Sequence, residues 1–179
     1  TVPPPYGMDR EVLPLSDVRA FVHLVARMHA VGAQRDAPHR PRLEPAGTCQ
    51  GLLDVVRRGG FLPADIAAAY ADCLSELANQ LAATTAGVPM QRIHNDPGTW
   101  NVLWRPEGPL LMDLDDFDVG PVAIDLATMH FPWRLDTIPE DAPADEKWAQ
   151  QRALVLSLYR EVAEFPESWE AMFDPLRTL

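Results

Sequence analysis

Residues 94–101 read His-Asn-Asp-Pro-Gly-Thr-Trp-Asn, and residues 110–116 read Leu-Leu-Met-Asp-Leu-Asp-Asp. The proline and glycine that follow Asp96 disfavour a regular element, so this carboxylate is expected on a loop. Asn101 opens one short apolar run and Asp113 ends the next, and the Arg-Pro-Glu-Gly sequence between the runs favours a turn. The two runs therefore predict a β-hairpin, with Asn101 and Asp113 close together at its open end.

This grouping of a loop carboxylate, an amide oxygen and a strand-end carboxylate suits Mg²⁺. That ion takes one or two carboxylates and completes its shell with water and substrate phosphates. Asn101 and Asp113 are the predicted metal ligands, and Asp115 is a further candidate. Asp96 remains available as a base or an orienting group for an attacking hydroxyl. These are the groups that phosphoryl transfer requires, because its transition state is stabilised by positioning and by charge neutralisation.

The same residues have simpler interpretations. A turn aspartate and an asparagine such as Asp96 and Asn101 can satisfy neighbouring backbone groups without any catalytic role. The acidic run of Asp115, Asp116 and Asp118 does not fit an EF-hand loop, and solvated or capping residues are the alternative to metal contact. The acidic residues between 136 and 146 could likewise attract a cationic acceptor or form a solvated loop.

The spacing H-x-D-x-x-x-x-N, with an aspartate twelve residues after the asparagine, matches the catalytic-loop and metal-aspartate spacing of kinases. The wider sequence resembles the aminoglycoside-phosphotransferase and choline-kinase branch of the protein-kinase-like fold. Within that branch it is similar to the stress response kinase A group. The resemblance is close over 92–127 and looser over 12–165. It is carried by residues 93–103, 112–116 and 120–126, with 27–32 and 39–41 similar to the segment after the hinge.

The resemblance implies a role for each site residue. Asp96 would be the catalytic base, Asn101 a metal ligand, and Asp113 the metal-binding aspartate that begins the kinase D-F-G. Asp125 would be a buried aspartate that holds the catalytic loop by its backbone, and His94 would pack beneath that loop. ATP and Mg²⁺ are the implied cofactors.

The expected fold is α+β and mainly helical. By resemblance it is the C-terminal lobe of a protein-kinase-like fold with a small central β-hairpin region. Residues 1–15 are predicted as an extended lead-in after the hinge, and residues 16–179 as the lobe itself. A kinase also needs a Gly-rich loop and a strand lysine paired with a glutamate. The sequence has no G-x-G-x-x-G, and Lys147 is its only lysine. The N-terminal ATP-binding lobe is therefore expected to precede this chain, which leaves the cofactor-binding residues unknown and the chain alone inactive.

Apolar spacing predicts helices on both sides of the hairpin. Ser16 is the predicted N-cap of a first helix that ends at Gly32. A third helix is expected to begin at Pro63, with a stripe that includes Ile66 and Tyr70. The other helices are expected near residues 49–57, 121–130 and 148–162, and from residue 169 onward.

Composition narrows the functional classes further. The 179 residues carry 15 Lys and Arg against 26 Asp and Glu, a net charge of −11, and 47% are hydrophobic. Such a balance is ordinary for a globular domain, while the acidic charge disfavours nucleic-acid partners. No apolar run reaches the roughly 18 residues of a membrane span, and no secretory signal is visible. A cytoplasmic protein without membrane partners is expected.

Cysteines and histidines give no separate site. Cys49 and Cys73 form neither a disulfide framework nor a zinc pattern, so both are expected to be reduced and buried. The histidines other than His94 are interpreted as packed, hydrogen-bonded side chains; they are His23, His29, His39 and His130.

The predicted function is an ATP-dependent phosphotransferase that transfers the γ-phosphate to a hydroxyl acceptor, with protein Ser/Thr as the first choice. A small-molecule kinase of the homoserine, choline or aminoglycoside type is the alternative. A non-catalytic fragment or a pseudokinase binding module is an alternative of another class. Two departures from the family pattern bear on the acceptor. Asn95 replaces the usual glycine, and Trp100 replaces a small residue, where its ring either shapes or hinders the acceptor pocket.

Overall fold

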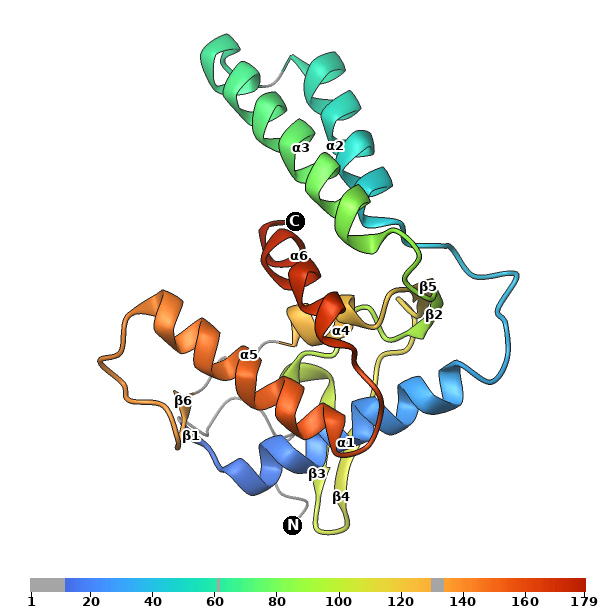
Figure 1. The fold of residues 1–179 in the computed structure, drawn as a ribbon, viewed down its shortest axis with the longest axis vertical. Coiled ribbons are helices and arrows are strands. Elements are labelled where there is room, and N and C mark those ends of the chain that lie inside the picture. Colours follow the sequence, from blue (N-terminus) through green and yellow to red (C-terminus); the bar gives the residue numbers. More distant parts are fainter. Residues whose placement is uncertain (1–11, 61, 130–133) are drawn as a thin grey trace.

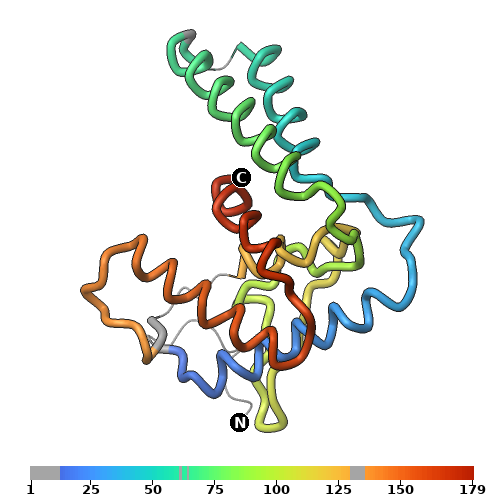
Figure 2. The backbone as a smooth tube through the Cα atoms, viewed as in Figure 1, coloured from blue at the N-terminus to red at the C-terminus, as the bar shows by residue number. Residues whose placement is uncertain are grey.

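The computed structural model describes residues 12–60, 62–129 and 134–179. Figure 1 shows a helical body from which a pair of helices, α2 and α3, stands out, while the hairpin β3–β4 extends from the opposite end. The path of the tube in Figure 2 shows the two protruding helices running side by side, joined only at their far end. The helices are α1 (Leu15–Gly32), α2 (Pro45–Gly59), α3 (Ala64–Thr85), α4 (Ala123–Thr128), α5 (Ala144–Arg160) and α6 (Phe173–Thr178).

The strands of the described segments form three separate two-stranded sheets. β3 (Val102–Arg105) and β4 (Gly108–Leu111) pair antiparallel, which confirms the predicted hairpin. β2 (Gln91–Ile93) pairs antiparallel with β5 (Asp118–Gly120), and β1 (Val12–Leu13) pairs parallel with β6 (Arg134–Leu135). The small β region lies between helices, so the predicted α+β, mainly helical fold is confirmed.

A core of apolar helix faces holds the body together. Helix α1 buries residues at helical spacing, and its Phe21 packs edge-on against Trp104 of β3 with ring centroids 6.3 Å apart. From the other side, α5 contributes Tyr159 and α6 contributes Phe173, both almost fully buried. Burying each such side chain stabilises the fold by roughly 1.5–3 kcal/mol. The buried apolar residues of α1 are Val18, Phe21, Val22, Val25 and Ala26.

Several predicted boundaries need correction. Ser16 is not the N-cap: Pro14 holds that position, and its carbonyl accepts the N–H groups of Asp17 and Val18 at 3.0 and 3.1 Å. Helix α2 begins earlier than expected, at Pro45, whose fixed φ suits a first helical position. Of the predicted lead-in, residues 1–11 lie outside the described residues. The last helix starts at Phe173, after the 3-10 segment η2 (Glu167–Met172), and α5 starts at Ala144.

The apolar stripe of α3 is only partly buried. Ile66 and Tyr70 are exposed, because the first turns of α3 stand clear of the body and meet only α2. Cys73 is exposed on the same helix, contrary to prediction, whereas Cys49 is buried and the pKa of its thiol is raised by that burial. No helix in the described part of the chain is both long and apolar enough to cross a membrane.

Gly32, the last residue of α1, packs closely against the backbone of β2. A Cβ at Gly32 would lie 2.8 Å from the backbone oxygen of Arg92, just before Ile93 enters the core. We expect Gly32→Ala to destabilise the protein by about 1–3 kcal/mol, because the backbone it meets cannot rotate away. Urea unfolding measures this. Gly51→Ala is the matched control: it lies on α2 with nothing near its Cβ position and should be neutral or stabilising. Equal behaviour of the two variants would contradict the close approach.

Candidate active site

Asp96 lies on the loop between β2 and the 3-10 turn η1 (Thr99–Asn101), as its neighbours predicted. The carboxylate is half-buried and accepts two hydrogen bonds at Oδ2. The Asn101 Nδ2 group donates at 2.8 Å, and the Trp100 indole Nε1 donates at 3.1 Å. Asn101 Nδ2 also donates to the backbone oxygen of Asp96 at 2.9 Å. The loop therefore folds back on itself and presents Asp96 in a fixed orientation.

The amide of Asn101 is oriented by these contacts. Both of its hydrogen bonds to Asp96 use the Nδ2 group, which assigns the amide nitrogen to that side. The amide oxygen then points away from Asp96 and is available as a cation ligand. Asn101 is buried, so its orientation is enforced by packing as well as by hydrogen bonds.

Asp113 stands beside Asn101 across the open end of the hairpin. The β3–β4 register pairs Val102 with Leu111, and the Met112 N–H donates to the Asn101 carbonyl at 2.9 Å. Asp113 follows directly, exposed and in the left-handed region with φ of 56°. Non-glycine residues rarely adopt this conformation, which often occurs at functional sites. An amide oxygen and a carboxylate thus share one edge, and this donor set fits Mg²⁺ that retains water and phosphate ligands.

His94 connects the Asp96 loop to the hairpin. Its Nε2 lies 2.9 Å from the Met112 carbonyl, and its Nδ1 accepts the Asp96 N–H at 3.4 Å. One neutral tautomer, protonated on Nε2, satisfies both contacts. The ring is fully buried, and both of its nitrogens have a hydrogen-bond partner within the protein.

Asp125, on α4, binds the backbone of the loop that carries Asp96. Its Oδ2 accepts the backbone N–H of His94 at 2.8 Å, and its Oδ1 accepts that of Asn95 at 2.7 Å. Asn95 has a φ of 72°, a conformation that asparagine tolerates better than most residues. Asp125 is 0% exposed, so these charge-assisted bonds replace the water that the carboxylate has lost.

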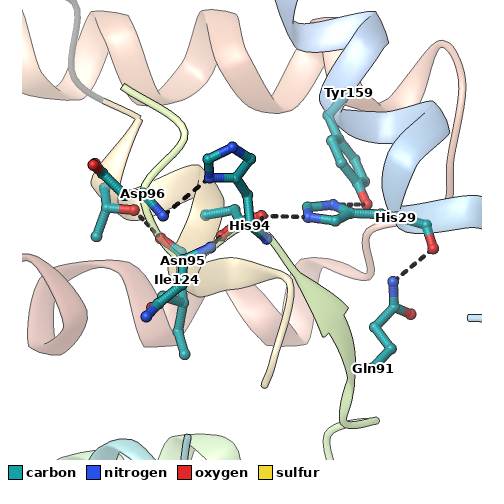
Figure 3. Close-up of polar contacts among 9 residues, drawn as sticks. His29, Gln91, His94, Asn95, Asp96, Ile124 and Tyr159 are labelled. Carbon is teal, nitrogen blue, oxygen red and sulfur yellow. Dashed lines mark hydrogen bonds and ion pairs between the residues drawn. The ribbon is translucent and has the colours of Figure 1, made fainter. Parts of the chain in front are cut away.

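A second pair of residues, which the sequence did not connect to the site, completes this network. His29 on α1 lies with its Nε2 2.8 Å from Asp125 Oδ2 and its Nδ1 3.0 Å from the Tyr159 hydroxyl. Figure 3 shows His94 between Asp96 and His29, with Tyr159 beyond. Burial, and then the charge of Asp125, raises the pKa of Tyr159, so its hydroxyl stays protonated and can donate to His29. The Gln91 side chain also donates to the His29 carbonyl at 2.8 Å.

The other acidic residues after Asp113 lie on the segment that leads to β5 and on β5 itself. Asp115 and Asp116 are exposed, and the Asp115 carbonyl accepts a hydrogen bond from Arg40 at 3.1 Å. Asp118 lies on β5, where burial raises its pKa and the nearby Arg40 charge opposes that shift. Within the described residues, no three His, Cys, Asp or Glu side chains form a metal-binding group.

Comparison with known proteins identifies the family of this chain. Residues 7–174 match the sequence profile of the phosphotransferase enzyme family. The chain belongs to this family. The resemblance predicted from 92–127 is thereby confirmed. Family membership supports kinase-type chemistry, while the roles of the individual residues rest on the contacts described above.

Two relatives and one solved structure extend this result. Stress response kinase A of Escherichia coli K12 is 27% identical over 180 residues, covering 97% of this chain and 49% of that protein. The serine/threonine protein kinase RdoA of Salmonella typhimurium is 27% identical over 177 residues, with the same two coverages. The chain thus spans about half the length of the curated relatives it matches. The amicoumacin kinase hAmiN, in complex with AMP-PNP, Ca²⁺ and Ami, matches with a TM-score of 0.66 and 16% identity. That match covers 96% of this chain and 52% of hAmiN, and it supports the kinase-like fold.

Proposed function

We propose that the complete protein transfers the γ-phosphate of ATP to a hydroxyl group. The observation that carries the proposal is the hydrogen-bonded pair of Asp96 and Asn101 at the open end of the hairpin, beside Asp113. The oxygen of the acceptor hydroxyl bonds to the γ-phosphorus, and Asp96 accepts the proton that this hydroxyl loses. The bond from that phosphorus to the β–γ bridging oxygen breaks, and ADP leaves with the bonding electrons.

Asn101 and Asp113 would hold Mg²⁺, which would neutralise charge on the phosphates when bound. Asp113 follows the end of β4 in a left-handed backbone conformation, and the Asn101 amide is held by its two bonds to Asp96. Use of ATP and Mg²⁺ by this chain is supported by the hAmiN complex, which contains a nucleotide analogue and a divalent cation.

The first choice of acceptor is a protein serine or threonine, and the name of the RdoA relative supports it. A small hydroxyl compound is the second choice, supported by the amicoumacin kinase. The intact set of Asp96, Asn101 and Asp113 argues against a pseudokinase, because a degenerate site usually loses at least one such group. It does not argue against a fragment that needs the rest of its protein.

An N-terminal lobe is the further partner that we propose. The relatives are about twice as long as this chain, and the chain carries no Gly-rich loop. Large apolar side chains beside the site are exposed, as expected of a face that another lobe covers; they are Trp100, Met112 and Leu114. The cytoplasm is the proposed location, in keeping with the two unpaired cysteines.

A transfer assay on the complete gene product tests the proposed function. Labelled ATP and Mg²⁺ would be supplied with a protein extract, and separately with homoserine, choline and an aminoglycoside. We expect label in protein Ser or Thr. Label only in a small molecule would overturn the protein acceptor, and no transfer with any acceptor and no ATP hydrolysis would overturn the phosphotransferase itself.

Removal of the metal-binding carboxylate gives a separate prediction. Asp113→Ala should raise the Mg²⁺ concentration needed for half-maximal activity by about 10-fold or more, because one charged ligand is lost. Magnesium titrations at fixed ATP measure the effect. Asp115→Asn tests the remaining candidate ligand in the same titration, and Glu107→Gln at the hairpin tip is the control. An unchanged titration for Asp113→Ala would remove this residue from the metal site.

A further inference from the structure

Trp100 directly precedes Asn101, the proposed metal ligand, and it contacts Asp96, the proposed base. Trp100 lies in η1, and its indole Nε1 donates to Asp96 Oδ2 at 3.1 Å. Asn101 Nδ2 also donates to this oxygen, and its second hydrogen goes to the Asp96 backbone carbonyl. The oxygen of the same Asn101 amide would hold the metal. The indole is a second attachment that does not depend on Asn101.

Gly98 provides the space that this contact needs. A Cβ at Gly98 would lie 2.1 Å from Cε2, 2.2 Å from Cζ2 and 2.6 Å from Cδ2 of the Trp100 ring. The ring therefore rests directly on the Gly98 backbone. Cε2 is bonded to Nε1, so any side chain at position 98 would push the N–H away from Asp96. Gly98 itself has an ordinary extended conformation, with φ of −71° and ψ of 155°. The requirement for glycine is thus one of space and not of backbone strain.

Two contacts fix the orientation of the Trp100 ring. Its N–H points to the Asp96 carboxylate, and one side of the ring rests on the Gly98 backbone. The rest of the side chain is exposed, on the face that the proposed N-terminal lobe would cover.

We propose that Trp100 is a positioning residue, whose indole N–H fixes the Asp96 carboxylate for the acceptor hydroxyl and whose ring requires glycine at position 98. This inference rests on the proposed function, since it gives Trp100 a role through the base. In this role the Trp100 ring helps to shape the site and does not hinder the acceptor.

The hydrogen bond can be tested without activity. Indole ¹⁵N labelling of the complete gene product gives one N–H signal per tryptophan, and Trp100→Phe identifies the signal of Trp100. We expect this signal to shift in Asp96→Ala and in Gly98→Ala, and to stay in place in Glu107→Gln. A signal that stays in place in both site variants would overturn the proposal.

Kinetics test the positioning role. Trp100→Phe keeps an aromatic ring but removes the N–H, and we expect kcat to fall by about 10-fold or more with the KM for ATP unchanged. Gly98→Ala should lower kcat to the same extent as Trp100→Phe. The double variant of Trp100→Phe and Gly98→Ala should have a kcat no lower than either single variant, because both changes remove the same contact. Wild-type kcat in Trp100→Phe, with Asp96→Ala inactive, would overturn this inference alone. A fully active Asp96→Ala would instead overturn the proposed function and this inference with it.

Discussion

Asp96→Asn is expected to lower the kcat of the complete gene product by about 10²–10⁴-fold while leaving the protein folded. The amide cannot take the proton of the acceptor hydroxyl. Asparagine keeps the size of the side chain and one oxygen, which can still accept from Asn101 and Trp100. The expected loss is therefore in the chemical step and not in the loop conformation.

Steady-state release of ADP in the presence of acceptor measures this loss, and circular dichroism checks the fold. Glu107→Gln is the matched control, since it also neutralises one carboxylate but lies exposed at the hairpin turn. An Asp96→Asn variant that keeps a tenth or more of wild-type kcat would show that Asp96 is not the base.

The hairpin and its polar ends could be predicted because their signals are local. The Pro-Gly pair after Asp96 indicates the loop, and the turn sequence that ends at Gly108 indicates the two strands. All of these signals lie within about 20 residues of one another. The register that pairs Val102 with Leu111 then follows from the four-residue turn sequence, and it places Asn101 next to Asp113. The role of Asp125 came from resemblance alone, and its bonds to the loop backbone support that assignment.

The contacts between distant elements could not be predicted in this way. His29 was expected to be packed, and it is, but its partners Asp125 and Tyr159 lie 96 and 130 residues away. No local pattern marks such pairs. The same limit explains an error: His39 was expected to be packed, yet it is exposed on the segment between α1 and α2. His23 is half-buried and contacts Glu161, whereas His130 lies outside the described residues.

Helix α3 shows how tertiary placement overrides a helical pattern. Its apolar spacing is real, and Leu74, Leu77 and Leu81 in the second half are buried. The first half projects with α2 beyond the body, so Ile66 and Tyr70 have no second layer to pack against. Periodicity identifies the helix and its apolar face, but only the fold decides how much of that face is covered.

Asp125→Ala should be the most destabilising single change near the site, at about 3–5 kcal/mol. The variant would leave three donors without their acceptor: the backbone N–H groups of His94 and Asn95, and Nε2 of His29. Each buried donor that loses its partner costs about 1–3 kcal/mol, and the loop that carries Asp96 would lose its anchor.

Urea unfolding of the complete gene product measures the effect, with Asp141→Ala as the control. Asp141 is exposed on the loop before α5, so its removal should change the free energy of unfolding by about 0.5 kcal/mol or less. Asp125→Ala should also lower kcat, since it frees the His94–Asn95 backbone, whereas Asp96→Asn should lower kcat without loss of stability. If Asp125→Ala unfolded at the same urea concentration as Asp141→Ala, the network from α1 through α4 to the loop would not be what holds Asp96 in place.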